Sequence, residues 1–388
     1  MAVSVGNRPS RVRSALAAVL TVLVLVPTGF LFMRLWQDIE AQRDSTKLEQ
    51  QGVEYLTSLA PLVSALAEAQ STALQGVSAA PNSLTAAVAG VASTDQRLGD
   101  TLGTHERWTG LREKIGKLPG VKGDSAQIFQ AHVEVTDLVL ALYRSVIDKS
   151  QLGRDRDNDI SHLQAALGVD LPGTVVQVSR MGDLSLMVAD IKGNAQERAQ
   201  AEATIIPQFG AAVQTVNADV ANLTDNLQGA VDDTRSGTLS GNLVATVDSF
   251  RRGVESFVRG ASPGGTAAPN PAAMATAQSQ LQTSLGGLAG VLVREMNGLL
   301  EDRLDRLDAR RIETLVAFGL AVLLALAAII AQLTGRRGRP VLPTDADLDR
   351  DMSVPHGGPG LAGNRQYDHP PYGDDVYPTR RERSGALR

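Results

Sequence analysis

Three polar residues interrupt apolar helical stripes in the middle of the sequence. Asp95 and His105 fall on one stripe and His132 on another, while a further histidine, His162, stands alone. Carboxylate and imidazole groups bind polar ligands and metal ions when the fold brings them together. If these side chains converge in one helical bundle, they line a polar ligand pocket or a weak metal site. The alternative is that each is a hydrogen-bonded residue that fixes helix register.

Two arginines close to these residues are further candidates for ligand or partner binding. Arg107 and Arg112 follow His105 on the same expected helix. A guanidinium group pairs readily with a carboxylate ligand. A solvated helix face explains the two arginines equally well, so both interpretations stay open.

No known catalytic motif is present in the sequence. The chain has no cysteine, which excludes disulfides, thiolate metal sites and cysteine nucleophiles. It also lacks HExxH, P-loop, GxSxG and glycine-rich nucleotide motifs. A net charge of −5 gives no support to nucleic-acid binding. We therefore expect a protein that is not an enzyme and that has no cofactor and no resident metal.

The segment between residues 36 and 311 is predicted to be helical nearly throughout. Apolar residues recur in alternating steps of four and three, as in Ile206, Phe209, Val213 and Val216. Gly- and Pro-containing breaks divide the segment into eight expected helices, which span 36–78, 82–117, 124–150, 155–167, 172–195, 197–231, 237–260 and 270–311. A helix with such a stripe must pack against others, so the fold class is all-α.

Two uncharged apolar runs enclose this helical segment. The first has 20 residues between Arg13 and Arg34, and the second has 22 residues from Thr314 to Gly335. Each is long enough to cross the hydrocarbon core of a bilayer as a helix. The first run could instead be a secretory signal, but it ends in bulky residues where a signal peptidase requires small ones. We expect a transmembrane anchor.

Flanking arginines predict how the two spans are oriented. Arg8, Arg11 and Arg13 precede the first span, whereas Arg336, Arg337 and Arg339 follow the second. The positive-inside rule places both termini in the cytoplasm of a plasma-membrane protein. An apparent internal duplication predicts two four-helix bundles in tandem in the external part. The alternative is that any two helices with a heptad pattern look alike. The expected order is an N-terminal segment (1–13), a transmembrane helix (14–34), a first bundle (35–168), a second bundle (169–311), a second transmembrane helix (312–335) and a disordered cytoplasmic tail (336–388).

The helix that leads into the second span is expected to transmit a signal. Leu300, Leu304 and Leu307 extend an apolar stripe toward the membrane, with acidic and basic residues on the other faces. A continuous helix can carry a small shift or rotation across a bilayer. The plainer alternative is a stiff stalk.

The tail is expected to bind a separate protein. Residues 336–388 are rich in Gly and Pro and poor in large aliphatic residues, which predicts disorder. Tyr367, Tyr372 and Tyr377 are spaced five apart among acidic residues. Such segments often become ordered on a partner.

The layout resembles the helical-bundle sensor regions of bacterial chemoreceptors and sensor kinases. It is more similar to the actinobacterial GlnX type of transmembrane protein, in the segments "LVSALAEAQSTALQGV" and "THERWTGLREKI" and in the arrangement of residues 14–335. That resemblance implies a tandem four-helix-bundle ectodomain without enzymatic output. It also implies an extracytoplasmic amino-acid-binding lipoprotein and a cytosolic Ser/Thr kinase as partners.

We therefore expect a non-enzymatic signal transducer whose ectodomain senses a solute or a solute-loaded binding protein. A homodimer is expected, because paired spans transmit motion readily. The alternative is a structural or scaffold protein of the cell envelope, for which the length of the helices would matter and their polar residues would not.

Overall fold

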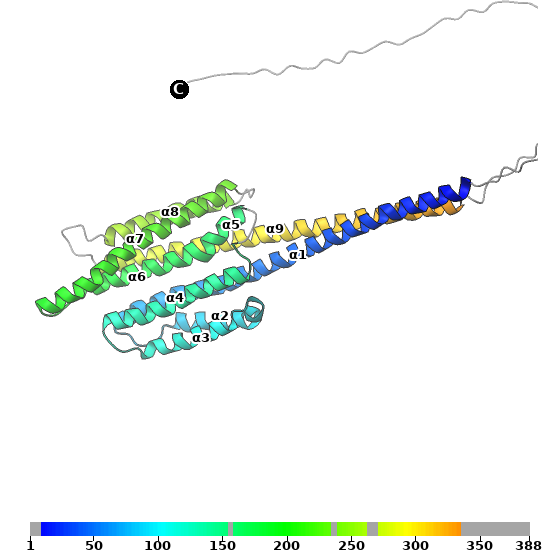
Figure 1. Cartoon of the computed structure of the whole chain (residues 1–388). Helices are drawn as coiled ribbons and strands as arrows, with labels where there is room; N and C mark the ends of the chain where they lie inside the picture. Colours follow the sequence, from blue (N-terminus) through cyan, green and yellow to red (C-terminus); the bar gives the residue numbers. More distant parts are fainter. Residues whose placement is uncertain (1–8, 154–157, 234–238, 262–270, 335–388) are drawn as a thin grey trace, which may run out of the picture. The chain divides into compact units, whose positions relative to one another are not determined.

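The computed structural model describes residues 9–153, 158–233, 239–261 and 271–334 (Figure 1). Within these ranges every regular element is helical and none is a strand, so the predicted all-α class is confirmed. The tail from residue 335 onward, with its three tyrosines, lies outside the described residues.

Long helices begin and end the described chain, and shorter helices lie between them. Their bounds are α1 (Pro9–Leu74), α2 (Asn82–Leu102), α3 (His105–Lys117), the 3-10 turn η1 (Leu118–Gly120), α4 (Ser125–Lys149), α5 (Asn158–Ala165), the π-turn η2 (Ala166–Asp170), α6 (Leu171–Ala189), α7 (Ala195–Asp233), α8 (Leu239–Ala261) and α9 (Pro271–Thr334).

The helices pack in two groups. In the first helix group, α1 contacts α2 and α4, and α3 contacts α2 and α4. In the second helix group, α5 and α6 contact α7, and α7 contacts α8. The side chain of Leu281 on α9 reaches Gly253 on α8, and that of Gln278 reaches Gly182 on α6, so α9 also belongs to this group. Contacts of α1 with α6 join the two groups.

Most positions of the predicted apolar stripes form the core, although Ile206 at the start of one stripe is exposed. Buried positions in the first group include Leu84, Val91, Leu98 and Leu102, and those in the second group include Leu223, Leu227, Phe250, Phe257, Leu285 and Leu292. Burial of these side chains against neighbouring helices removes apolar surface from water and holds the helices together.

The expected single helix over residues 82–117 is wrong, because the chain turns at Gly103. Gly103 has a φ of +59° and ends α2 in the left-handed conformation, which glycine adopts without steric cost. Its N–H donates to the Asp100 carbonyl, and the Thr104 N–H donates to the Gly99 carbonyl. The new helix α3 then begins at His105. Beyond the turn, the apolar residues of α3 therefore do not continue the stripe of α2.

The expected break at "GVDLPGT" is also wrong. Helix α5 continues through η2 into α6, and the N–H of Leu171 donates to the carbonyl of Ala166, five residues earlier. Pro172 has no N–H and would disturb a regular helix at this point. The wider π-turn accommodates it near the start of α6.

Two of the described helices are long and apolar enough to cross a membrane, as the sequence predicts. They are α1 and α9, and most of their large apolar side chains over residues 16–35 and 312–330 are exposed. Neither helix is interrupted where its apolar segment meets the more polar part of the chain. In particular, α9 carries the stripe of Leu300, Leu304 and Leu307 directly into the apolar segment, which confirms the predicted continuity.

Candidate functional site

The candidate functional site is the stretch where α1 and α9 lie side by side next to their apolar segments (Figure 1). Its first part is aromatic. Phe32 stacks on Phe318 with ring centroids 4.1 Å apart and planes inclined by 18°. Trp36 lies 5.9 Å from Phe32, and the guanidinium of Arg311 sits 4.5 Å from the centroid of the Trp36 ring. A cation over an indole face is attracted by the ring quadrupole.

Ion pairs continue the contact toward the two helix groups. Arg43 Nε lies 2.7 Å from Asp308 Oδ1, and Arg43 Nη2 donates to Asp308 Oδ2 at 3.3 Å. Arg311 lies 3.3 Å from Glu40, whose other oxygen lies 3.6 Å from Arg43. These pairs are partly shielded, since the Arg43 side chain is only 16% exposed.

A further ion pair lies farthest from the apolar segments. Arg303 Nη1 is 3.6 Å from Glu49 Oε2, and the Glu49 side chain is only 4% exposed. Removing one partner of such a pair leaves a shielded charge uncompensated, which costs more than removing an exposed pair. We call the whole set the juxtamembrane clasp, which consists of Phe32, Trp36, Glu40, Arg43 and Glu49 on α1 and Arg303, Asp308, Arg311 and Phe318 on α9.

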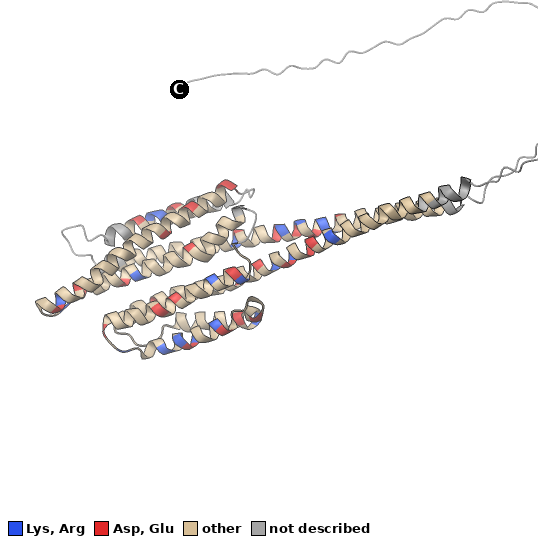
Figure 2. Cartoon of the chain, viewed as in Figure 1, with Lys and Arg blue, Asp and Glu red and all other residues tan. Residues whose placement is uncertain are grey.

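The juxtamembrane clasp shows which positions of α1 and α9 face each other. Along α1 the partners run from Phe32 to Glu49, while along α9 they run backward from Phe318 to Arg303, as in an antiparallel pair. Figure 2 shows charged residues on both helices up to this level and none along the apolar segments beyond it. A rotation or shift of one helix against the other would therefore change every pair that joins α1 to α9.

The predicted signal-transmitting leucines lie on α9 beside the clasp. Leu300 and Leu307 are buried, and Leu304 is half-buried. Leu300 belongs to the main apolar core. The stripe therefore connects the core of the helix groups to the charged part of α9.

Asp95 and His105 lie together, but as part of a closed hydrogen-bond cluster. Asp95 is buried, and its Oδ1 accepts from the hydroxyls of Tyr55, at 2.8 Å, and Thr104, at 2.9 Å. His105 Nδ1 lies 2.8 Å from Asp95 Oδ2 and donates to it, because an ionised carboxylate only accepts. Gly99 makes room, since a Cβ there would lie 2.7 Å from Asp95 Oδ1. The cluster ties α1 to the turn between α2 and α3.

His105 and the two arginines are accessible to solvent. The His105 side chain is 63% exposed, contrary to its predicted seam position, because the turn at Gly103 rotates α3 relative to the preceding stripe. Arg107 and Arg112 are both exposed on α3. None of the three lines the cavity next to His132.

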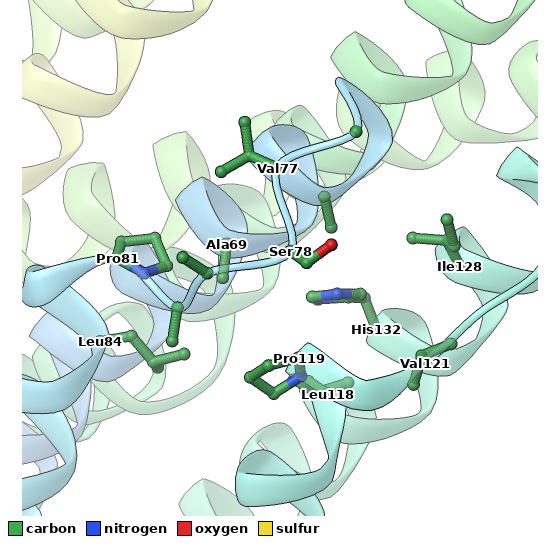
Figure 3. A pocket seen from close by; sticks show the side chains of 14 residues that line it. Ala69, Val77, Ser78, Pro81, Leu84, Leu118, Pro119, Val121, Ile128 and His132 are labelled. Atoms are coloured by element: carbon green, nitrogen blue, oxygen red, sulfur yellow. The ribbon is translucent and has the colours of Figure 1, made fainter.

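His132 lies elsewhere, on α4, near the loop between α1 and α2 (Figure 3). It is 3% exposed, and burial lowers the pKa of its imidazole to about 4. His162 belongs to the second helix group, where its Nδ1 lies 3.1 Å from Asn226 Oδ1. Asn226 Nδ2 in turn donates to Asp170 at 2.6 Å. The histidines thus contact different partners, and the described residues contain no group of three or more His, Asp or Glu that could hold a metal ion.

Asp183 is a polar residue that the sequence analysis missed. It is completely buried on α6, and its Oδ2 accepts from Gln70 Nε2 of α1 at 2.8 Å. Burial raises the pKa of this carboxyl to about 7, and the hydrogen bond from Gln70 limits the rise. An acidic residue inside the apolar run "VVQVSRMGDLSLMV" was the signal that could have identified it.

Most of the juxtamembrane clasp was also missed. The sequence shows that charges of both signs flank the apolar runs, but it does not show which of them face each other. That information depends on the rotation of each helix, which the packing of the whole protein sets.

Comparisons with known proteins leave the class open. The chain matches no family model, and no curated protein or solved structure is significantly similar to it. The fold and the juxtamembrane clasp are therefore the basis for a functional proposal.

Proposed function

We propose that this protein is a non-enzymatic transmembrane signal transducer. Helices α1 and α9 supply two membrane spans, and residues 35–311 form an extracytoplasmic tandem four-helix bundle that senses a solute or a solute-loaded binding protein. The observation that carries the proposal is the juxtamembrane clasp, which pairs the two candidate spans where they leave the apolar region.

The direction of the spans follows from charge. Three arginines precede the apolar part of α1 and three follow that of α9, at residues 8, 11, 13, 336, 337 and 339. The positive-inside rule favours both termini in the cytoplasm, and interfacial Trp36 suits the opposite face of the bilayer.

Signal transfer proceeds through a small change in how α1 and α9 pair. The first helix group is built on α1 and the second includes α9, so a rearrangement between the groups acts on both spans. Both helices are continuous, so a shift or rotation outside the membrane is carried through it. The tail after α9, with Tyr367, Tyr372 and Tyr377, recruits a cytosolic partner.

The similarity to the GlnX type suggests which partners to test. We propose an amino-acid-binding lipoprotein outside the cell and a Ser/Thr kinase that controls amino-acid metabolism inside it. A homodimer is the proposed assembly, and neither a cofactor nor a nucleic acid takes part.

The first experiment tests the topology. Because the chain has no native cysteine, only the introduced cysteine can react with a maleimide. Ala203→Cys, on an exposed position of α7, and Ser384→Cys, in the tail, are labelled in intact cells with a membrane-impermeant maleimide. We expect only Ala203→Cys to react before the cells are lysed. Labelling of Ser384→Cys in intact cells contradicts the proposed orientation.

The second experiment separates a transducer from a scaffold of the envelope. Cells carry either the full chain or a chain truncated after Arg339, and their growth is compared with amino acids as the only nitrogen source. A transducer that lacks its tail should behave like a deletion of the gene. If the truncated chain restores wild-type growth, the signalling proposal is wrong and a scaffold is favoured.

A further inference from the structure

A small cavity lies at one end of the first helix group. It is enclosed by the ends of α1 and α4, by the loop that joins α1 to α2, and by η1 (Figure 3). Its volume is about 90 Å³. The side chains that line it are mostly apolar, and the larger ones are Val77, Leu84, Leu118, Val121 and Ile128.

His132 is the only titratable side chain that lines this cavity. The residue is 3% exposed, and its Nδ1 is buried without a hydrogen-bond partner among the described residues. Figure 3 shows its ring extending from α4 toward the loop that carries Ser78. A buried polar atom without a partner is costly, and such atoms are usually satisfied by protein, water or ligand.

Asp95, in the same helix group, shows how a buried polar side chain is satisfied by its neighbours. Asp95 is equally buried, yet it accepts hydrogen bonds from three side chains. The imidazole of His132 faces a space that can admit a molecule. We therefore propose that this cavity binds a small uncharged organic molecule that has an apolar body and one hydrogen-bonding group, which pairs with the imidazole of His132.

The chemistry of the walls defines the ligand class. No Asp, Glu, Lys or Arg lines the cavity, and burial keeps His132 neutral at neutral pH by lowering its pKa to about 4. A charged ligand would lose its hydration without gaining a counter-charge. The volume is smaller than the ~150 Å³ of an engineered apolar cavity that binds benzene, so the ligand is a compact alcohol or amide.

A free amino acid does not fit this description, because it carries two charges at neutral pH. The inference deepens the proposed function and rests on it in one respect, namely that the cavity belongs to a sensor. An amino-acid signal would then reach the chain through a binding protein, while the cavity takes a separate uncharged effector.

The test uses the full chain in lipid nanodiscs, with nitrogen-15 in its histidine rings. The His132 resonances are assigned by their loss in His132→Gln. Isobutanol is titrated first, followed by isobutyrate and isobutylammonium, which have the same apolar body and opposite charges. We expect isobutanol to shift the His132 ring nitrogens saturably with a millimolar dissociation constant, and neither ion to do so.

Two variants control for non-specific effects. Ala73→Leu fills part of the cavity and should weaken isobutanol binding at least tenfold, whereas Ala203→Leu, at an exposed position of α7, should leave it unchanged. If Ala73→Leu does not fold, the titrations of the unmodified chain with isobutanol, isobutyrate and isobutylammonium still test the proposal. The proposal is overturned if isobutanol gives no saturable shift, if the ions shift His132 equally, or if only water occupies the site. The topology and truncation experiments are independent of this result, so either proposal can fail alone.

Discussion

Asp183 places an ionisable group in the contact between the two helix groups. Burial raises its pKa to about 7, compared with about 3.9 in an unfolded chain. Between these two values the folded protein holds a proton that the unfolded chain releases, so stability falls as the pH rises from about 4 to about 7. His132 has the opposite effect. Its pKa is lowered to about 4, so its contribution to stability increases between about pH 4 and pH 6.5.

We predict that Asp183→Asn removes the loss of stability that Asp183 causes at neutral pH. Asparagine keeps the shape of the side chain and an acceptor for Gln70. The variant should exceed the wild type at pH 8 by on the order of 1–4 kcal/mol in the free energy of unfolding, and by much less at pH 5. Chemical denaturation at both pH values checks this. Since His132 is present in both proteins, its own pH dependence cancels, and an equal difference at both pH values would refute the prediction.

Asp95 should be one of the most sensitive residues of the first helix group. Asp95→Ala leaves the buried hydroxyls of Tyr55 and Thr104 without an acceptor. We expect a loss of about 2–4 kcal/mol in the free energy of unfolding. The control is His105→Ala, which removes an exposed partner and should cost less than about 1 kcal/mol. Similar losses in the two variants would show that the cluster does not tie α1 to the turn.

Among the paired helices, the contact between Arg43 and Asp308 can be tested by exchanging charges. Arg43→Asp puts a third carboxylate beside Asp308 and Glu40, and Asp308→Arg puts two guanidinium groups together. Each single change should destabilise the full chain in nanodiscs, and the exchange of both residues should recover roughly 1 kcal/mol or more. Thermal unfolding measures the effect.

An exposed ion pair provides the matched control for this exchange. Glu113 and Lys117 are 2.6 Å apart on α3, with side chains that are 68% and 69% exposed. Their exchange should change stability by less than about 0.5 kcal/mol. If Arg43 and Asp308 behave in the same way, their contact does not hold the helices in register.

The type and approximate extent of most elements can be predicted from the sequence, because an apolar period near 3.5 residues is a strong signal. It identifies the core positions of α7, α8 and α9 and the two apolar spans. Two expected bounds were wrong for local reasons. Gly103 ends a helix that the stripe would continue, and a π-turn at residues 166–170 allows a helix to pass a proline that would otherwise end it.

The contacts of the candidate site were harder to predict from the sequence. Sequence position correctly marked Asp95 and His132 as buried polar residues, but the Tyr55 partner of Asp95 lies 40 residues earlier and the Arg43 partner of Asp308 lies 265 residues away. Such pairs depend on the rotation and register of separate helices. The similarity to the GlnX type, the partners and the tail function stay predictions.

At the scale of the whole molecule, the two helix groups are expected to unfold together. The described residues up to Leu333 form a single compact unit, and α1 contacts α6 within it. Leu66→Ala in the first group and Leu227→Ala in the second each empty a buried position and should cost about 2–5 kcal/mol. Both should lower the midpoint of one shared thermal transition, as scanning calorimetry can measure. Two separate transitions, each sensitive to one variant, would contradict this.

The uninterrupted passage of α1 and α9 out of their apolar segments restricts how these helices can change in length. One residue inserted between Phe32 and Glu49 would turn everything beyond it by about 100° and direct Arg43 away from Asp308. A seven-residue insertion in each helix would nearly restore the facing positions, because it adds almost two complete turns. Natural variants of this protein should therefore gain or lose residues here in matched heptads, while the loops at the far ends of the helices vary freely.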